Sequence, residues 1–281
     1  ADMNWDGDNA SGNFSYNNNW YGDTQPSWNF GNGNLVFNYS NNASQTSLYV
    51  DYGGWRTTND IFWVSTYGKS MTLSSDGNGF NFAARIENQS SFPQTVTMPL
   101  SGGQNSAGRM ELNPRDADLT LSGPIYNDNS VDYQVWGSFS PKQTTLTLNT
   151  NLGVGSTAAN VDFIQQQDSN NRNTLVNVAV SQAWAGTTTV NSGSFVTGSG
   201  VTLASSAIVV GGGTVASTSA NTFADSATLT VNSGRLSIGG NDTVASLAGS
   251  GGTVNVATGA TLTAGGAGST SYAGSITGGG N

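Results

Sequence analysis

The sequence predicts an all-β protein whose C-terminal part is a solenoid of stacked repeats, and three observations support this prediction. Glycine accounts for 38 of the 281 residues, whereas charged residues make up only 9%. From 185 to 281 the chain is almost without charge and instead repeats short β-like phrases that end in Gly or Asn. No segment shows a sustained helical hydrophobic period, so we expect little helix. Imperfect repetition is typical of architectures in which each unit buries its apolar side against its neighbours.

The first region of the chain, residues 1–145, holds most of the tryptophan, tyrosine and charge. Its strand-like runs alternate apolar and polar residues, as half-buried strands do, and turn residues separate them. The runs that we expect to form strands are 35–39, 47–52, 61–67, 70–74, 80–86, 94–100, 109–113, 118–123 and 133–139. The segment 161–167 is the least strand-like. We therefore divide the chain into an aromatic-rich β region at 1–145, which is either separate or the start of the same solenoid, and β-helix repeats at 146–281.

The second region repeats the phrase VNSG, at 190–193 and at 231–234. Four apolar residues in and after these phrases suit the interior of a stack: Val190, Phe195, Val231 and Leu236. Asn tolerates the left-handed backbone of a sharp corner and Gly adopts it freely. The predicted corner residues are therefore Asn191, Gly193, Asn232 and Gly234. Stacked Asn side chains would also hydrogen-bond along the axis as a ladder.

Three phrases of the repeat region resemble one known family. GTTTVNSGSFVTGSGVTL at 186–203, NTFADSATLTVNSGRLSIGG at 221–240 and SYAGSITGGGN at 271–281 are similar to the autotransporter-associated β-strand repeat family. The opening, with MNWDGDN, NNNWYGDTQ and NLVFN, is similar to the leader that often precedes such repeats. The resemblance implies a right-handed parallel β-helix in a large exported bacterial surface protein, usually without catalytic residues.

Two features depart from the pattern of that family. The middle section, 41–145, has few clear repeat phrases, and the chain stops where another repeat would normally begin, as in a fragment or a processed product. The start at Ala1 rather than Met fits an exported protein that has lost its signal peptide, and equally a trimmed chain. We expect a location outside the cell or on a bacterial cell surface.

Charge and composition argue against several classes of protein. The net charge is -9, and the eight basic residues are scattered, so they form no phosphate-binding stripe and nucleic acid is not an expected partner. The absence of Cys and His removes disulfides, the commonest general base and the commonest transition-metal ligand. No stretch approaches the roughly 18 consecutive apolar residues of a membrane helix, so we expect no membrane-spanning segment.

Two groups of residues are candidate binding sites. Asp6 and Asp8 offer hard oxygen ligands at alternate positions, as at the start of a calcium loop, although the later bidentate Glu is missing and Asx-rich turns look the same without metal. Among the clustered aromatic residues, most should form core, including Phe37, Tyr49, Phe62, Phe80 and Phe82. The candidates for an exposed carbohydrate-binding surface are Trp20, Tyr21 and Trp55.

A catalytic role has weaker support. Glycoside hydrolysis needs two carboxyl groups that flank one bond. The closest pairs in the sequence are Asp116 with Asp118, Asp128 with Asp132, and Asp6 with Asp8. A solvated edge or turn, with Arg115 as a local partner, explains the first pair equally well. We therefore predict that the protein is not an enzyme and that it uses no cofactor, calcium excepted.

Three functions remain open from the sequence. The first is a structural or adhesive extracellular β-solenoid. In one version it assembles head-to-tail with copies of itself into a filament or surface coat, because an uncapped solenoid presents open strand edges. In that hypothesis the aromatic first region receives the repeat end of the next subunit. The second is a module that binds cell-surface polysaccharide through aromatic residues. The third is a β-helix enzyme that degrades polysaccharide.

Overall fold

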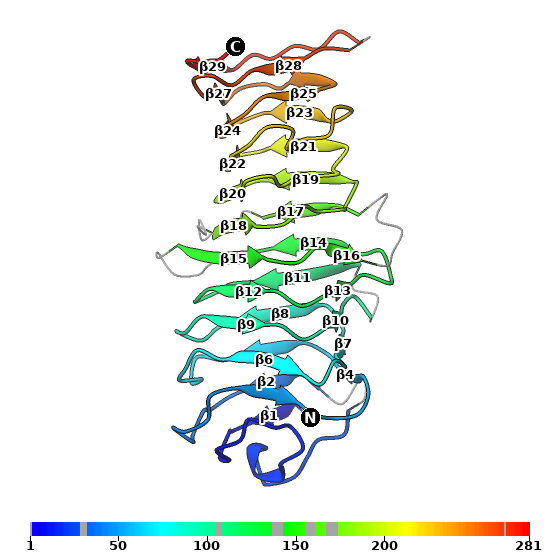
Figure 1. The fold of residues 1–281 in the computed structure, drawn as a ribbon, viewed down its shortest axis with the longest axis vertical. Helices are drawn as coiled ribbons and strands as arrows, with labels where there is room; N and C mark the ends of the chain where they lie inside the picture. The colour runs from blue at the N-terminus through cyan, green and yellow to red at the C-terminus, as the bar shows by residue number, and fades with distance from the viewer. Residues whose placement is uncertain are drawn as a thin grey trace.

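The chain folds as a β-solenoid in which parallel strands stack coil upon coil along one axis (Figure 1). This computed structural model describes residues 2–28, 33–104, 108–136, 143–154, 161–166, 174–266 and 268–281. In these residues the one helical element is the 3-10 turn η1 (Asn17–Asn19). No helix in this part of the chain has the length and hydropathy needed to cross a bilayer. The predicted all-β solenoid is confirmed.

Two sheets of 11 strands run the length of the stack, and we call them sheets A and B. Sheet A contains β1 (Met3–Trp5), β2 (Leu35–Phe37), β5 (Ile61–Trp63), β8 (Arg85–Asn88), β11 (Arg109–Asn113), β14 (Asp132–Val135), β17 (Phe163–Gln165), β19 (Thr187–Val190), β21 (Ala207–Val210), β23 (Thr228–Val231) and β26 (Ser246–Ala248). Sheet B contains β3 (Leu48–Val50), β6 (Thr72–Ser75), β9 (Gln94–Val96), β12 (Leu119–Leu121), β15 (Thr144–Leu148), β18 (Thr174–Val178), β20 (Ser194–Thr197), β22 (Thr214–Ser217), β24 (Arg235–Ile238), β27 (Thr253–Val256) and β29 (Ser275–Gly278). The sheets cross the boundary near 145 without a break.

A third, five-stranded sheet, here called sheet C, closes the coils of the first half. It contains β4 (Arg56–Thr58), β7 (Phe80–Phe82), β10 (Leu100–Ser101), β13 (Ile125–Tyr126) and β16 (Leu152–Val154). Near the C-terminal end a separate parallel pair forms from β25 (Asp242–Val244) and β28 (Leu262–Ala264). From β2 to β16, each coil therefore visits sheets A, B and C in turn.

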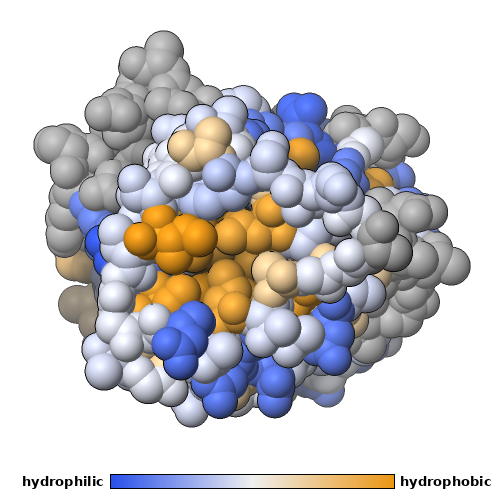
Figure 2. Space-filling view, turned by 90° about the horizontal axis from the view of Figure 1, so that it is seen from above, coloured by the Kyte–Doolittle hydropathy of each residue, from blue (hydrophilic) through white to orange (hydrophobic). Residues whose placement is uncertain are grey.

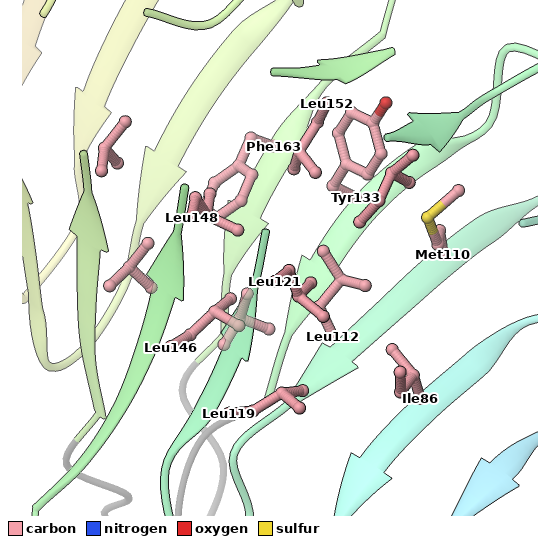
Figure 3. Close-up of a cluster of buried hydrophobic side chains, with 14 of the residues drawn as sticks. Ile86, Met110, Leu112, Leu119, Leu121, Tyr133, Leu146, Leu148, Leu152 and Phe163 are labelled. Atoms are coloured by element: carbon pink, nitrogen blue, oxygen red, sulfur yellow. The ribbon is translucent and has the colours of Figure 1, made fainter. Parts of the chain in front are cut away.

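The core is a set of apolar columns that run parallel to the solenoid axis. Strand residues alternate between the interior and the surface, and the register places like residues on top of one another. Leu119 pairs with Leu146, which pairs with Val176, and all three are fully buried. Figure 3 shows Leu119, Leu121, Leu146 and Leu148 of sheet B in the same buried cluster as residues of sheet A. The residues predicted for the interior, Val190, Phe195, Val231 and Leu236, are also fully buried.

The coils differ in length, which hides the repeat in the first half of the sequence. Met3 pairs with Leu35, 32 residues further on, whereas Leu229 pairs with Leu247, only 18 residues further on. The additional residues of the longer coils lie in corners and loops, because the paired strands themselves stay three to five residues long in most coils. The middle section therefore belongs to the same stack although it lacks recognisable repeat phrases.

Acidic and amide side chains at one corner connect several neighbouring coils. The Oδ1 atom of Asp2 accepts the backbone N–H of Asn34 at 3.0 Å, and Oδ1 of Asn34 accepts that of Asp60 at 3.2 Å. Further along the same side, Oδ1 of Asp132 accepts the N–H of Asp162 at 3.0 Å, and Asp162 accepts that of Thr187. Short polar side chains at turns readily bond nearby backbone in this way. Asp2, Asn34, Asp132 and Asp162 thus have structural roles.

A column of glycines forms the corner between sheets A and B in the second half. It consists of Gly193, Gly213, Gly234, Gly252 and Gly274, each directly before a strand of sheet B. The carbonyl of each of the first four accepts the N–H of the strand in the next coil, for example Arg235 N to Gly213 O at 3.0 Å. Gly193 and Gly234 have φ of +66° and +75°, as a left-handed corner requires.

The predicted role of asparagine at these corners needs correction. Asn191 and Asn232 do not have positive φ. They also do not stack directly, because the register places Gly211 between them. Instead, Oδ1 of Asn232 accepts the N–H of Ser250 at 3.3 Å. The left-handed conformation therefore belongs to glycine, which carries no Cβ to clash with the next coil.

The segment 161–167, the least strand-like in the sequence, contains the strand β17, although residue 167 lies outside the described residues. Phe163 is fully buried and stacks on Trp184 with ring centroids 4.8 Å apart. Gln165 points inward as well, and its Nε2 donates to Thr174 O at 2.8 Å. A glutamine that satisfies backbone groups inside the stack reads as polar in the sequence, which weakens the strand pattern of this segment.

The N-terminal end of the stack is closed by its own chain. At the outer edge of β1, the backbone N–H of Tyr21 donates to Asn4 O at 2.9 Å, and Trp5 and Trp20 form an antiparallel bridge. The outer edge of β3 is covered similarly, since Phe14 N donates to Tyr49 O at 2.9 Å. An aromatic cluster seals the same end, made by Trp5, Phe14, Trp20, Trp28 and Phe37. These described strand edges are therefore not open to another subunit.

The opposite end exposes apolar surface. Viewed from above the last coil, Figure 2 shows hydrophobic residues gathered at the centre and polar residues around them. Ile276 of β29 is 64% exposed, and no residue after Asp242 is charged. The two ends of the described chain are therefore chemically different.

Candidate functional site

The three aromatic residues predicted to bind carbohydrate lie in different environments. Trp20 is 1% exposed and packs edge-on against Trp5, while its Nε1 donates to Phe14 O at 2.9 Å. The prediction for Trp20 is wrong, because a ring buried in the N-terminal aromatic cluster cannot stack on a ligand. Tyr21 is 75% exposed beside a wide hollow of about 530 Å³, and Trp55 is 39% exposed.

Trp55 forms one wall of a groove on the outer surface of sheet C. The groove has a volume of about 260 Å³ and is lined by Trp55, Asn81, Ser101, Tyr126 and Asp128. The rings of Trp55 and Tyr126 meet edge to face, with centroids 6.1 Å apart. Ligand pockets that enclose a drug-sized molecule have about 300–1,000 Å³, so this groove is of the size of a single small ring.

Four successive coils bring the lining residues together. Trp55 directly precedes β4, Asn81 lies in β7, Ser101 in β10 and Tyr126 in β13, and these strands are neighbours in sheet C (Figure 1). The register pairs Asn81 with Ser101 and Ser101 with Tyr126. Their inward neighbours Phe80, Leu100 and Ile125 are buried. Because side chains alternate along a strand, burying this apolar column turns the polar column outward.

Glycine makes room for the aromatic wall. A Cβ atom at Gly79 would lie 3.0 Å from Cη2 of Trp55 and 2.7 Å from the carbonyl carbon of Pro99. A side chain at this position would therefore push the indole ring away from the sheet or separate two coils. The packing of Trp55 depends on this bare stretch of backbone.

A short hydrogen-bond chain fixes the carboxylate of Asp128. Nε2 of Gln104 donates to Oγ of Ser101 at 2.7 Å, and Oγ of Ser101 donates to Oδ2 of Asp128 at 3.1 Å. Ser101 is buried, so its hydroxyl is held between these two partners. The chain orients Asp128 and leaves its Oδ1 without a hydrogen bond from any residue that the structure describes.

The other polar groups of the groove are also available. Within the described ranges, no hydrogen bond engages the amide of Asn81, the hydroxyl of Tyr126 or Nε1 of Trp55. Together with Oδ1 of Asp128, they supply donors and acceptors around two aromatic faces. Sites that bind small molecules commonly combine apolar walls with a few convergent polar groups in this way.

The positively charged residue next to Trp55 in the chain, Arg56, contacts another aromatic ring. Its guanidinium lies over the ring of Tyr52, 4.7 Å from the centroid. This cation–π contact engages the guanidinium, and Arg56 is not among the residues that line the groove. Asp128 is thus the one charged side chain among the five lining residues.

The structure does not assemble a calcium site around Asp6 and Asp8. Asp6 is buried, and burial together with the charge of Asp8 raises the pKa of the Asp6 carboxyl group. Oδ1 of Asp8 instead accepts Nδ2 of Asn41 at 2.7 Å. Across the described ranges, no three acidic, His or Cys side chains come together as metal ligands. The pair therefore fits the Asx-rich turn that was the alternative interpretation.

The paired aspartates of the sequence are likewise engaged in structural contacts. Oδ1 of Asp118 accepts the N–H of Thr145 at 2.8 Å, and a carboxylate oxygen of Asp116 lies 3.6 Å from Nε of Arg115. Asp132 does not join Asp128 in the groove, because its Oδ1 holds the next coil of sheet A through Asp162. The groove therefore contains a single carboxylate.

A cluster of ion pairs lies on the outer face of sheet A, around the buried carboxylate of Glu111. Nε of Arg85 and Nε of Arg109 each donate to Glu111 at 2.7 Å, and Nδ2 of Asn113 donates to Glu87 at 3.0 Å. Burial raises the pKa of the Glu111 carboxyl group, but the hydrogen bond from Arg109 and the charge of Arg85 outweigh it and lower that pKa. This cluster ties β8 to β11 and leaves Glu111 saturated.

Sequence reasoning identified Trp55 but missed its partners Asn81, Ser101 and Tyr126. They are separated by about one coil each, so aligning the coils of sheet C would have placed them in one column. Comparisons with protein-family models, with curated proteins and with solved structures give no match to this chain.

Proposed function

We propose that this protein is a non-catalytic, adhesive β-solenoid that binds a glycan in the groove lined by Trp55 and Tyr126. The observation that carries the proposal is the joint presence of exposed aromatic faces and unengaged polar groups on one rigid sheet. A sugar ring has C–H groups on its faces and hydroxyls at its edge, so it fits such a surface. We place the protein outside the cell or on a bacterial surface, where polysaccharide is exposed.

A binding role fits the groove better than hydrolysis. Glycosidases generally use two carboxyl groups on either side of the bond that they cleave. The groove has only Asp128, and the acidic residues nearest to it in the sequence make structural contacts elsewhere. A rigid scaffold that presents side chains in fixed positions also keeps the entropic cost of binding low.

The test is a glycan array probed with the wild-type chain, Trp55→Ala and Tyr21→Ala. We expect the wild type to bind a subset of glycans, Trp55→Ala to lose that binding by tenfold or more, and Tyr21→Ala to retain it. Tyr21 is the matched control, because it is an exposed aromatic residue outside the groove. Loss in Tyr21→Ala with retention in Trp55→Ala would contradict the proposal and indicate the N-terminal hollow instead.

Self-association is a second candidate, and the exposed end of the stack favours it. The last coil offers unpaired strand edges and apolar surface, which can template a further strand from a second molecule or from a longer chain. The head-to-tail version has less support, because the described N-terminal edges are already paired. Ile276→Asp should abolish any concentration-dependent increase in mass measured by light scattering. An oligomer that persists in this variant would contradict this route.

A further inference from the structure

We infer that the groove selects neutral glycans over anionic ones, and that Asp128 is the residue that sets this selectivity. The inference rests on the proposed function and adds the class of ligand. It starts from the charge of the lining, which consists of one carboxylate and four uncharged side chains.

The geometry gives Asp128 a defined role toward a ligand. The hydrogen bonds from Gln104 through Ser101 occupy its Oδ2, and no described residue donates a hydrogen bond to its Oδ1. A carboxylate accepts hydrogen bonds but donates none. Oδ1 therefore accepts a hydroxyl group of a sugar, and such a charge-assisted hydrogen bond is stronger than a neutral one.

The same carboxylate disfavours an acidic sugar. A uronate or a sulfate ester in the groove would place a second negative charge close to Asp128. No lining residue is positively charged, and the guanidinium of Arg56 is held over Tyr52. Like charges at close range repel even at an exposed carboxylate such as Asp128, and no residue that lines the groove carries a compensating positive charge.

The aromatic and uncharged polar residues of the groove also favour a neutral sugar ring. Trp55 and Tyr126 contact the uncharged faces of a ring, and Asn81 can both donate to and accept from hydroxyl groups. A neutral polyhydroxylated ring satisfies all of these groups at once. The occupant that the site fits is therefore one residue of a neutral polysaccharide or oligosaccharide.

The experiment uses pairs of polymers that share a backbone and differ in charge: hydroxyethylcellulose with carboxymethylcellulose, and dextran with dextran sulfate. Affinity electrophoresis or calorimetry is run at 0.15 M and 0.5 M NaCl. At about 0.15 M the Debye length is roughly 8 Å, so the net charge of -9 is largely screened and the local contact remains. In at least one pair we expect the wild type to bind the neutral member at least tenfold more tightly.

Three variants distinguish the effect of Asp128 from the effect of the net charge of the protein. Asp128→Asn keeps an acceptor for Ser101 but loses the charge-assisted hydrogen bond to the sugar hydroxyl. Binding of the neutral member should therefore weaken, whereas binding of the anionic member should rise at least tenfold. Asp225→Asn changes the net charge equally but lies on an exposed turn of the C-terminal half, and it should leave the selectivity unchanged. Trp55→Ala should lose both members of every pair.

The outcomes distinguish this inference from the function on which it rests. Equal wild-type binding of both members, or unchanged selectivity in Asp128→Asn, would refute the inference while Trp55-dependent binding upheld the function. An equal shift in Asp225→Asn would also refute it, because the effect would then belong to net charge. Binding that survives Trp55→Ala, or no binding to any glycan, would overturn the proposed function and the inference together.

Discussion

Close contact of the coils at the glycine column leads to a prediction about Gly234→Ala. Gly234 has φ of +75°, and a Cβ atom there would lie 2.8 Å from the carbonyl carbon of Gly212 and still closer to the oxygen of Gly213. The variant therefore suffers two separate penalties, one from its backbone conformation and one from steric overlap with the preceding coil. Gly213 O is also the acceptor for Arg235 N, so relief of the overlap stretches a sheet hydrogen bond.

Two other glycines measure these penalties one at a time. Gly200 has φ of +72° but no atom within 4 Å of its would-be Cβ, so Gly200→Ala should cost about 1–2 kcal/mol from conformation alone. Gly213 is not left-handed, but its Cβ would lie 2.7 Å from Gly193 O, so Gly213→Ala should cost about 1–3 kcal/mol from overpacking. If the two effects add, Gly234→Ala should lose about 2–5 kcal/mol of unfolding free energy.

Urea unfolding followed by circular dichroism compares the three variants with the wild type. Because repeat proteins can unfold in parts, hydrogen exchange of β22 and β24 should accompany the global measurement. We expect Gly234→Ala to be the most destabilised of the three variants, with increased hydrogen exchange localised to β22 and β24. If Gly234→Ala is no more destabilised than Gly200→Ala, the coils do not approach as closely as described and the reasoning fails.

Three further changes test the charges and the core, each by the urea midpoint. Glu111→Gln should cost about 1–3 kcal/mol at pH 7, after discounting for the partly exposed arginines. Since Arg109 and Arg85 lower the pKa of Glu111 from 4.5, that cost should vanish as the pH falls through this lowered value, and a constant cost would contradict the pairing. Burial raises the pKa of the Asp242 carboxyl group from 3.8, so its contribution to folding stability is present below pH 3.8 and is lost as the pH rises. Asp242→Asn should therefore gain stability relative to the wild type between pH 4 and 7. A relative loss of stability over this range would refute the assignment. Phe163→Ala should lose about 3–5 kcal/mol through a cavity inside the stack, and a loss below 1 kcal/mol would show that this ring is not core.

Strand identity could be read from the sequence because burial imposes a local pattern. The run 109–113 corresponds residue for residue to β11, and the run 61–67 begins where β5 begins. Phe37, Phe80 and Phe82 are core as expected, but Tyr49 and Phe62 are only partly buried. Alternation shows that a strand has two faces without showing which face each aromatic residue takes.

The candidate site could be predicted only in part, for a related reason. Exposure of Trp55 followed from its polar surroundings in the sequence, whereas the same argument failed for Trp20, whose neighbours fold over it as a cap. Tyr126 and Asn81 join Trp55 through the register of stacked coils of unequal length. Such register is a long-range property, so no local window of the sequence contains it.

The most direct test of the account is a crystal structure of the chain with the neutral oligosaccharide that binds best. The account predicts a sugar ring within about 4 Å of the Trp55 and Tyr126 rings, a contact distance for packed groups, with a hydroxyl group on Oδ1 of Asp128. A sugar bound beside Tyr21, on sheet A or sheet B, or nowhere on the chain would contradict it.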